Sequence, residues 1–170
     1  MQFGKRRGRC LHERPALDQH RRHPRGLRVV EFNARFGDPE TQPLLALLDS
    51  PLGVVLKAAA DGRLDEVGPL RWKDGAAVAV VVAAHRYPDT PRTGDVIHGV
   101  LDAERLEGVD VIHAGTATDG QGNLVTAGGR VLAVTAVGPT VAQARDRAYQ
   151  GVACLSIEGA HHRTDIAADV

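Results

Sequence analysis

Residues 29–42 constrain the fold of this chain more than any other stretch. Over residues 29–36 apolar side chains alternate with polar ones, and successive side chains of a strand point to opposite faces, so the pattern predicts an amphipathic β-strand. Its polar face carries, in order, Glu31, Asn33 and Arg35. Alternate side chains on one strand lie roughly 6.6 Å apart. A carboxylate, an amide and a guanidinium are therefore presented side by side.

The polar face of this strand offers two hard oxygen donors and then a cation. Carboxylate and amide oxygens are ligands that Mg²⁺ prefers, so Glu31 and Asn33 are candidate ligands of a small Mg²⁺ cluster. Arg35 could then hold phosphate or carboxylate oxygens through two parallel hydrogen bonds. The alternative is a strand whose polar face is simply solvated, and alternation alone does not decide between the two.

Length and composition place the chain among ordinary globular proteins. It has 170 residues, 43% of them hydrophobic and 25% charged, which suits one domain or slightly more. With only 4% aromatic residues, the core must be built from valine, leucine and alanine. No apolar run reaches the roughly 20 residues that span a bilayer, and no secretory pattern is visible. Cys10 and Cys154 are expected to be reduced thiols, as in a cytoplasmic protein. We expect no membrane partner.

The first 28 residues differ from the rest in charge, with nine Lys and Arg against two acidic residues. Residues 1–26 are expected to form a disordered basic arm, because they offer too little apolar surface to offset the entropy of ordering. A nucleic-acid-binding tail is the alternative, but the arm lacks interleaved aromatics, so we expect no nucleic-acid partner. The abrupt change in composition also fits a segment read out of frame or a misplaced start site.

Residues 27–72 combine the strand with two expected helices. Asp38 suits a helix N-cap and Pro39 the first helical position, so one helix is expected to start there. A second helix is expected to begin at Pro51 and to end before a polar segment rich in Gly and Pro, residues 61–75. This polar segment marks a boundary between two subdomains.

Residues 73–170 are expected to form a β-rich domain closed by one helix, which makes the fold class α+β. The run 76–84 is short, apolar and rich in valine, which favours a strand buried on both faces. Further short strands are expected over residues 96–100, 109–114, 124–127 and 130–137. Their spacing suggests an antiparallel meander that curls into a small barrel or sandwich. Thr140 then caps the closing helix.

The segment after the first strand resembles the signature of phosphoribosylamine–glycine ligase, also called glycinamide ribonucleotide synthetase. We call this segment the signature turn; it reads Arg35-Phe36-Gly37-Asp38-Pro39-Glu40-Thr41-Gln42. The second half of the chain resembles the C-terminal domain of the same ligase at residues 87–88, 93–99, 113–116, 128–132, 134–136 and 140–149. That family belongs to the ATP-grasp superfamily. The resemblance implies that residues 27–72 are the end of an ATP-grasp lobe.

The resemblance implies an ATP-dependent ligase of purine biosynthesis that joins glycine to 5-phosphoribosylamine. Carried over residue by residue, Glu31 and Asn33 would bind Mg²⁺ or Mn²⁺, and Arg35 would stabilise the transferring phosphoryl group. Asp38 and Glu40 would help shape the substrate pocket. Their alternative is a local role as N-cap and first-turn acids.

One more candidate substrate-binding residue lies far along the chain. Arg130 follows the Gly128-Gly129 turn and could reach a ribose phosphate, or it could be an ordinary surface arginine on a strand. By contrast, Gly120 and Gly122 are expected in a hairpin turn rather than in a phosphate loop.

The chain also departs from the family it resembles. A full ligase has upstream lobes that supply the glycine-rich loop, the phosphate-binding lysine and the adenine pocket, and the 170 residues contain none of these. We therefore expect this chain alone to be catalytically incomplete. The alternative is a non-enzymatic module that complements a partner chain carrying the ATP lobes. Another ATP-grasp carboxylase or ligase is disfavoured by the residues 37–40, because carboxylases have a different segment after the arginine.

Overall fold

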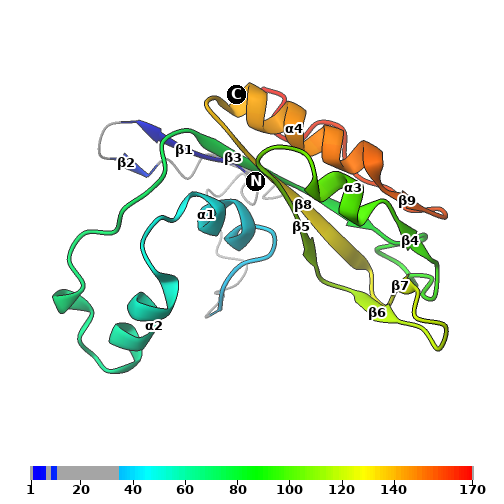
Figure 1. The fold of residues 1–170 in the computed structure, drawn as a ribbon, viewed down its shortest axis with the longest axis horizontal. Helices are drawn as coiled ribbons and strands as arrows, with labels where there is room; N and C mark the ends of the chain where they lie inside the picture. Colours follow the sequence, from blue (N-terminus) through cyan, green and yellow to red (C-terminus); the bar gives the residue numbers. More distant parts are fainter. Residues whose placement is uncertain (1, 7–8, 11–34, 170) are drawn as a thin grey trace, which may run out of the picture.

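The computed structural model describes residues 2–6, 9–10 and 35–169. Its centre is an antiparallel sheet built on β3 (Ala76–Ala83), β8 (Arg130–Gly138) and β5 (Val109–His113). Two helices, α4 (Val141–Cys154) and α3 (Val100–Glu104), cover one face of this sheet. The opposite face packs against α1 (Thr41–Leu47) (Figure 1). The described part of the chain is thus a sheet between two helical layers.

Strand β3 confirms the expected valine-rich buried strand. Its residues pair with β8 along nearly their whole length, with Val80 opposite Val134. Almost every residue of β3 is buried, as expected for a central strand with helices on both faces. On the face towards α1, the small side chains of Ala77, Ala79 and Ala133 are buried and leave room for the helix to lie close.

The main core lies between the sheet and α4. Val78, Val80 and Val134 are fully buried against it, together with the helix residues Ala144 and Ala148. The closing helix begins as predicted, because the Thr140 side chain accepts a hydrogen bond from the Gln143 N–H and so satisfies one of the free amides of the first turn.

The expected meander that closes into a barrel is wrong for the residues that the structure describes. The sheet is open, with the order β2-β1-β3-β8-β5, so β8 lies between two strands that both precede it in sequence. The remaining strands form two separate ribbons: β4 (Ile97–His98) with β9 (Ser156–Ile157), and β6 (Thr116–Thr118) with β7 (Leu124–Thr126). Helices cover both faces of the sheet, and this layering takes the place of barrel closure.

The expected strand over residues 96–100 is also shorter than predicted. Only Ile97 and His98 are in a strand, and Gly99 then adopts φ +84° and starts α3. A glycine is needed here because a Cβ at Gly99 would lie 1.9 Å from the Cys154 carbonyl oxygen.

Part of the N-terminal arm adds to the sheet. Strand β1 (Gln2–Arg6) pairs with β3, with Gln2 opposite Val78, and β2 (Arg9–Cys10) pairs with β1. The arm was expected to be disordered throughout, and these two strands differ from that expectation. The physical reason is that residues Ala76–Val78 of β3 would have an unpaired edge without β1. Residues 11–34 lie outside the described part, so the extent of the arm stays a prediction.

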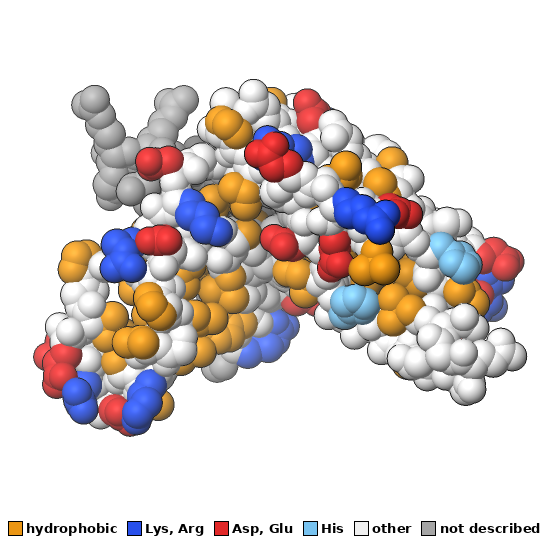
Figure 2. All heavy atoms as spheres, in the orientation of Figure 1, with side chains coloured by type: hydrophobic (Ala, Val, Ile, Leu, Met, Phe, Trp, Pro, Cys, Tyr) orange, Lys and Arg blue, Asp and Glu red, His pale blue; other side chains and the backbone are white. Residues whose placement is uncertain are grey.

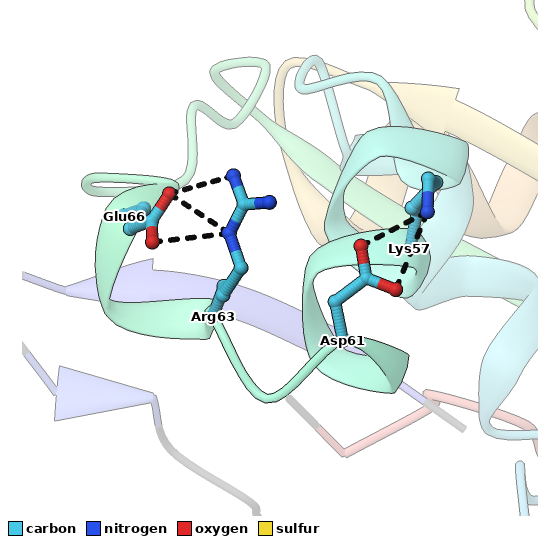
Figure 3. A network of polar contacts seen from close by, with 4 residues as sticks. All are labelled: Lys57, Asp61, Arg63 and Glu66. Atoms are coloured by element: carbon cyan, nitrogen blue, oxygen red, sulfur yellow. Dashed lines mark hydrogen bonds and ion pairs between the residues drawn. The ribbon is translucent and has the colours of Figure 1, made fainter.

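The segment before β3 holds two helices and a short 3₁₀ turn. Helix α2 (Leu52–Ala60) ends as predicted, with Asp61 as its C-cap and Gly62 at φ +69°. The turn η1 (Leu64–Glu66) follows, and ion pairs Lys57–Asp61 and Arg63–Glu66 lie on this outer surface (Figure 3). Trp72 then pairs with Leu48 in an isolated antiparallel β-bridge.

Helix α1 begins later than the sequence suggested. It starts at Thr41 with Glu40 in the N-cap position, and no side chain caps it. The N-cap role expected for Asp38 is therefore wrong, and so is the first helical position expected for Pro39. Asp38 is instead engaged by a side chain distant in sequence, as described next.

Candidate functional site

The signature turn meets the start of β8 through Asp38 and Arg130. The Arg130 Nη1 atom donates to the Asp38 carbonyl oxygen at 3.2 Å, and its Nη2 atom lies 3.2 Å from the Asp38 carboxylate oxygen Oδ2. These residues are 92 positions apart. The structure thus brings together two of the candidate substrate-binding residues, and both remain partly exposed, at 34% for Asp38 and 43% for Arg130.

Gln42 extends this contact towards the sheet. Its Nε2 atom donates to the Asp38 carboxylate oxygen Oδ1 at 3.0 Å. Each oxygen of the Asp38 carboxylate therefore has a different partner. The side chain is held from two sides, which fixes the turn relative to β8.

Glu40, the third candidate substrate-binding residue, folds back over the signature turn. Its Oε2 atom is buried and has no hydrogen-bond partner in the described part of the chain. A Cβ at Gly37 would lie 2.5 Å from that oxygen, so a larger residue at this position would require the Glu40 side chain to shift. A buried carboxylate oxygen without a donor is uncommon in folded proteins.

Arg35 lies at the exposed start of the described segment. Its Nη1 atom donates to the Phe36 carbonyl oxygen at 2.9 Å, and it has no ion pair with any residue that the structure describes. The candidate metal ligands Glu31 and Asn33 lie outside the described residues. Among the residues that are described, no three His, Cys, Asp or Glu side chains gather into a metal site.

A cavity of about 530 Å³ lies between α1 and the sheet. Sequence reasoning missed it. Its lining includes Thr41, Gln42, Leu45, Asp110, Ile112 and Thr135. Gln42 belongs both to this lining and to the contact with Asp38, so the cavity adjoins the signature turn. The one available signal was Thr135, a lone hydroxyl in the otherwise apolar run of residues 131–137.

Groups with shifted pKa values lie elsewhere and stabilise loops. A hydrogen bond to Asp95 raises the pKa of Arg92, which also donates to the Glu158 carbonyl oxygen. Hydrogen bonds from Asn123 lower the pKa of Asp119 in the turn between β6 and β7. Gly122 lies in the same turn at φ +87°, in agreement with the hairpin expected there. None of these groups lines the cavity next to the signature turn.

Two further observations concern the length of the helices and the cysteine Cys154. Within the described ranges, no helix combines the length and apolar character that crossing a membrane requires. Cys154 is a free thiol on α4, and its Sγ atom lies 3.4 Å from the Gln150 carbonyl oxygen.

The comparison with protein families agrees with the fold of the C-terminal part of the chain. Residues 77–169 match the family described as phosphoribosylglycinamide synthetase, C domain. This range begins in β3 and runs past α4, so it covers the strands β3, β5 and β8 together with the closing helix. The chain belongs to this family.

Individual relatives extend the match to the signature turn. The chain is 58% identical over 146 residues to phosphoribosylamine–glycine ligase of Streptomyces coelicolor, covering 85% of this chain and 35% of the relative. It is 51% identical over 142 residues to the ligase of Mycobacterium tuberculosis, covering 84% and 32%. Stretches this long within 170 residues must include both residues 35–42 and Arg130.

A solved structure gives the same picture. The chain superposes on phosphoribosylamine–glycine ligase of Thermotoga maritima with a TM-score of 0.66 and 36% identity. The superposition covers 85% of this chain and 34% of the other. The chain therefore spans about a third of the length of the relatives that it matches.

Proposed function

We propose that this chain supplies the C-terminal part of an ATP-dependent ligase that joins glycine to 5-phosphoribosylamine. The observation that carries the proposal is the 58% identity to a ligase of that name over a stretch that includes the signature turn. The contact between Asp38 and Arg130 supports it, because it joins that turn to the C-terminal domain. The products would be glycinamide ribonucleotide, ADP and phosphate.

The proposed reaction has two steps. A carboxylate oxygen of glycine attacks the γ-phosphorus of ATP, and ADP leaves to give glycyl phosphate. The amine of 5-phosphoribosylamine then attacks the acyl carbon, phosphate leaves and the amine nitrogen loses a proton. Such phosphoryl transfer depends mainly on positioning and on charge stabilisation. The exposed guanidinium of Arg35 would neutralise charge on the transferring phosphoryl group.

The metal would be bound by residues just before the described segment. Glu31 and Asn33 provide the oxygen donors that suit Mg²⁺ or Mn²⁺. A metal held by these two residues would supply positive charge that offsets the repulsion between the phosphates and the attacking carboxylate. Asp38, Glu40 and Arg130 would position the substrates.

We further propose that the 170-residue chain is inactive without the nucleotide-binding lobes of the family. Those lobes would come from further residues of the same polypeptide or from a partner chain. Five of the seven exposed large hydrophobic side chains among the described residues lie between residues 36 and 70: Phe36, Val54, Leu56, Leu64 and Leu70. Figure 2 shows hydrophobic side chains gathered over α1 and α2. Apolar surface of this kind is typical of a covered interface.

Reconstitution tests this proposal. The chain is mixed with a polypeptide that carries the upstream two thirds of the Streptomyces coelicolor relative, and ADP release is measured with glycine and 5-phosphoribosylamine. We expect release that needs both polypeptides and both substrates. Arg35→Ala should abolish it, whereas Arg71→Ala, which removes an exposed arginine paired with Asp49, should not. A stable mixture without substrate-dependent release would contradict the proposal.

A further inference from the structure

The first part of the signature turn is tied to the C-terminal domain by a single side chain. Within the described part of the chain, Arg130 makes the only hydrogen bond and the only ion pair between residues 35–40 and residues 73–170. Its Nη1 atom donates to the Asp38 carbonyl oxygen, and its Nη2 atom lies 3.2 Å from the Asp38 carboxylate. One guanidinium therefore holds both the backbone and the side chain of Asp38.

The backbone of Arg130 is itself held firmly in the sheet. The residue lies opposite Ala83 of β3, and its carbonyl oxygen accepts a hydrogen bond from the Gly115 N–H at 2.9 Å. A Cβ at Gly115 would lie 2.7 Å from that oxygen, so the two backbones are in close contact. A side chain that extends from such a well-held backbone can fix the position of the group it binds.

The same contact leaves Arg130 poorly placed to bind a phosphate. A phosphate is held best by two guanidinium nitrogens side by side, and both Nη atoms of Arg130 are directed at Asp38. The Asp38 carboxylate next to them would also repel a phosphate. These contacts favour a role of Arg130 towards the turn over the direct contact with a ribose phosphate that the sequence suggested.

The turn held by Arg130 carries a residue with a proposed part in the reaction. It begins at Arg35, three positions before Asp38, and it is continuous with α1, because the Thr41 side chain donates to the Gly37 carbonyl oxygen at 2.6 Å. A shift of the turn would therefore move the guanidinium of Arg35. Misplacement of a reacting or stabilising group by about 1 Å can lower a rate about 100-fold.

We infer that Arg130 is a positioning residue, which holds the signature turn and with it Arg35 against the C-terminal domain and does not itself bind substrate. The role of Arg35 rests on the proposed function, whereas the hold on the turn rests on the contacts of Asp38. The C-terminal domain would thus influence the reaction through one contact with a turn that lies 92 residues earlier in the chain.

Amide hydrogen exchange of the 170-residue chain tests the hold on the turn. The probe is the backbone N–H of Thr41, which donates to the Gly37 carbonyl oxygen. Arg130→Gln should speed its exchange about fivefold, because a contact that restrains the turn is lost. The control is Arg145→Gln, since Arg145 also donates to a backbone carbonyl oxygen, that of Ile166, but lies on α4 across the sheet. The control should leave the exchange unchanged, and an unchanged rate in Arg130→Gln would overturn the inference.

Kinetics of the chain reconstituted with the upstream polypeptide separate positioning from substrate binding. Arg130→Gln should lower kcat about 10–100-fold and leave the KM for 5-phosphoribosylamine within about twofold. An arginine that binds the substrate phosphate would instead raise that KM about tenfold or more, and this result would overturn the inference. Arg145→Gln should change neither parameter.

A double variant tests whether Arg130 acts through Asp38. Arg130→Gln and Asp38→Asn each remove the same ion pair, so their combined loss in kcat should be clearly smaller than the product of the two single losses. A combined loss equal to that product would mean that Arg130 acts on the reaction independently of Asp38, and it would overturn the inference.

The outcomes also distinguish this inference from the proposed function. If no reconstituted sample releases ADP in a substrate-dependent way, the proposed function is wrong, and the exchange of the Thr41 amide still decides whether Arg130 holds the turn. Ligase activity with an unchanged kcat in Arg130→Gln would do the reverse, because the proposed function would stand and the inference would not.

Discussion

At the residue scale, one ion pair joins the signature turn to the C-terminal domain. Asp38 could have capped α1, which is the role its position suggested, yet its carboxylate faces Arg130 and Gln42 instead. Local capping was overridden by a partner 92 residues away. This kind of competition is invisible to any reading of neighbouring residues.

A double-mutant cycle measures this pair. Asp38→Asn, Arg130→Gln and the double variant are compared by urea unfolding. Both side chains are partly exposed, so we expect a modest coupling of about 0.5–1 kcal/mol. The pair Lys57–Asp61, which lies one helical turn apart and is more exposed at the lysine, is the control and should couple by about 0.3–0.5 kcal/mol. A coupling near zero between Asp38 and Arg130 would contradict the geometry described here.

A second residue-scale prediction concerns Asp119. Its carboxylate accepts hydrogen bonds from the Asn123 side chain and from the backbone N–H groups of Asn123 and Gln121, which lower its pKa in the folded protein. A lowered folded pKa means that the stabilisation is present above the unfolded pKa and is lost as pH falls through the folded pKa. Carbon-13 titration of the side chain should show this low value.

Asn123→Ala should raise the pKa of Asp119 towards that of a free carboxyl group. Asp165, whose pKa is lowered by a hydrogen bond from Arg163, is the internal control and should not change. An unchanged pKa of Asp119 in the variant would contradict the assignment of its cause.

At the element scale, the strands that could be predicted are those with a strong local signal. The valine run of β3 and the Thr140 cap of α4 both follow from neighbouring residues. The order of strands did not follow, because β8 pairs with β3 and β5 across long stretches of chain. Thr135 shows the same limit for the site. The sequence alone does not distinguish a strand threonine that faces water from one that faces a cavity.

The junction between α3 and α4 provides an element-scale prediction. Gly99→Ala would place a Cβ 1.9 Å from the Cys154 carbonyl oxygen, and it adds the cost of a left-handed conformation, about 1–2 kcal/mol. Gly94 has a similar φ of +89° but open space around it. Gly94→Ala should therefore cost only the conformational part, and the Gly99 variant clearly more, as measured by thermal unfolding.

Helix α2 supplies the opposite control. Gly53 lies inside the helix, and a Cβ there would meet nothing within 4 Å. Gly53→Ala should stabilise the chain by about 0.5–1 kcal/mol, because alanine loses less entropy in a helix.

Equal destabilisation by the Gly94→Ala and Gly99→Ala variants would contradict the close contact between Gly99 and the end of α4.

At the scale of the whole molecule, the two parts of the chain differ in how they are packed. The sheet and α4 enclose a continuous core, whereas no residue of α2 is buried within the described part of the chain. The segment around α1 and α2 thus resembles one side of an interface, as expected if the family's nucleotide-binding lobes cover it. The chain spans only about a third of its relatives, in keeping with this view.

Calorimetric titration of ATP-Mg tests the central claim, that this chain holds only part of a ligase active site. The titration is made into the chain alone and into the chain mixed with the upstream polypeptide. We predict binding to the chain alone that is weaker than about 100 μM, and clearly tighter binding to the mixture than to the chain. Binding to the chain alone tighter than about 100 μM would contradict the account, because the 170 residues would then hold a nucleotide site of their own.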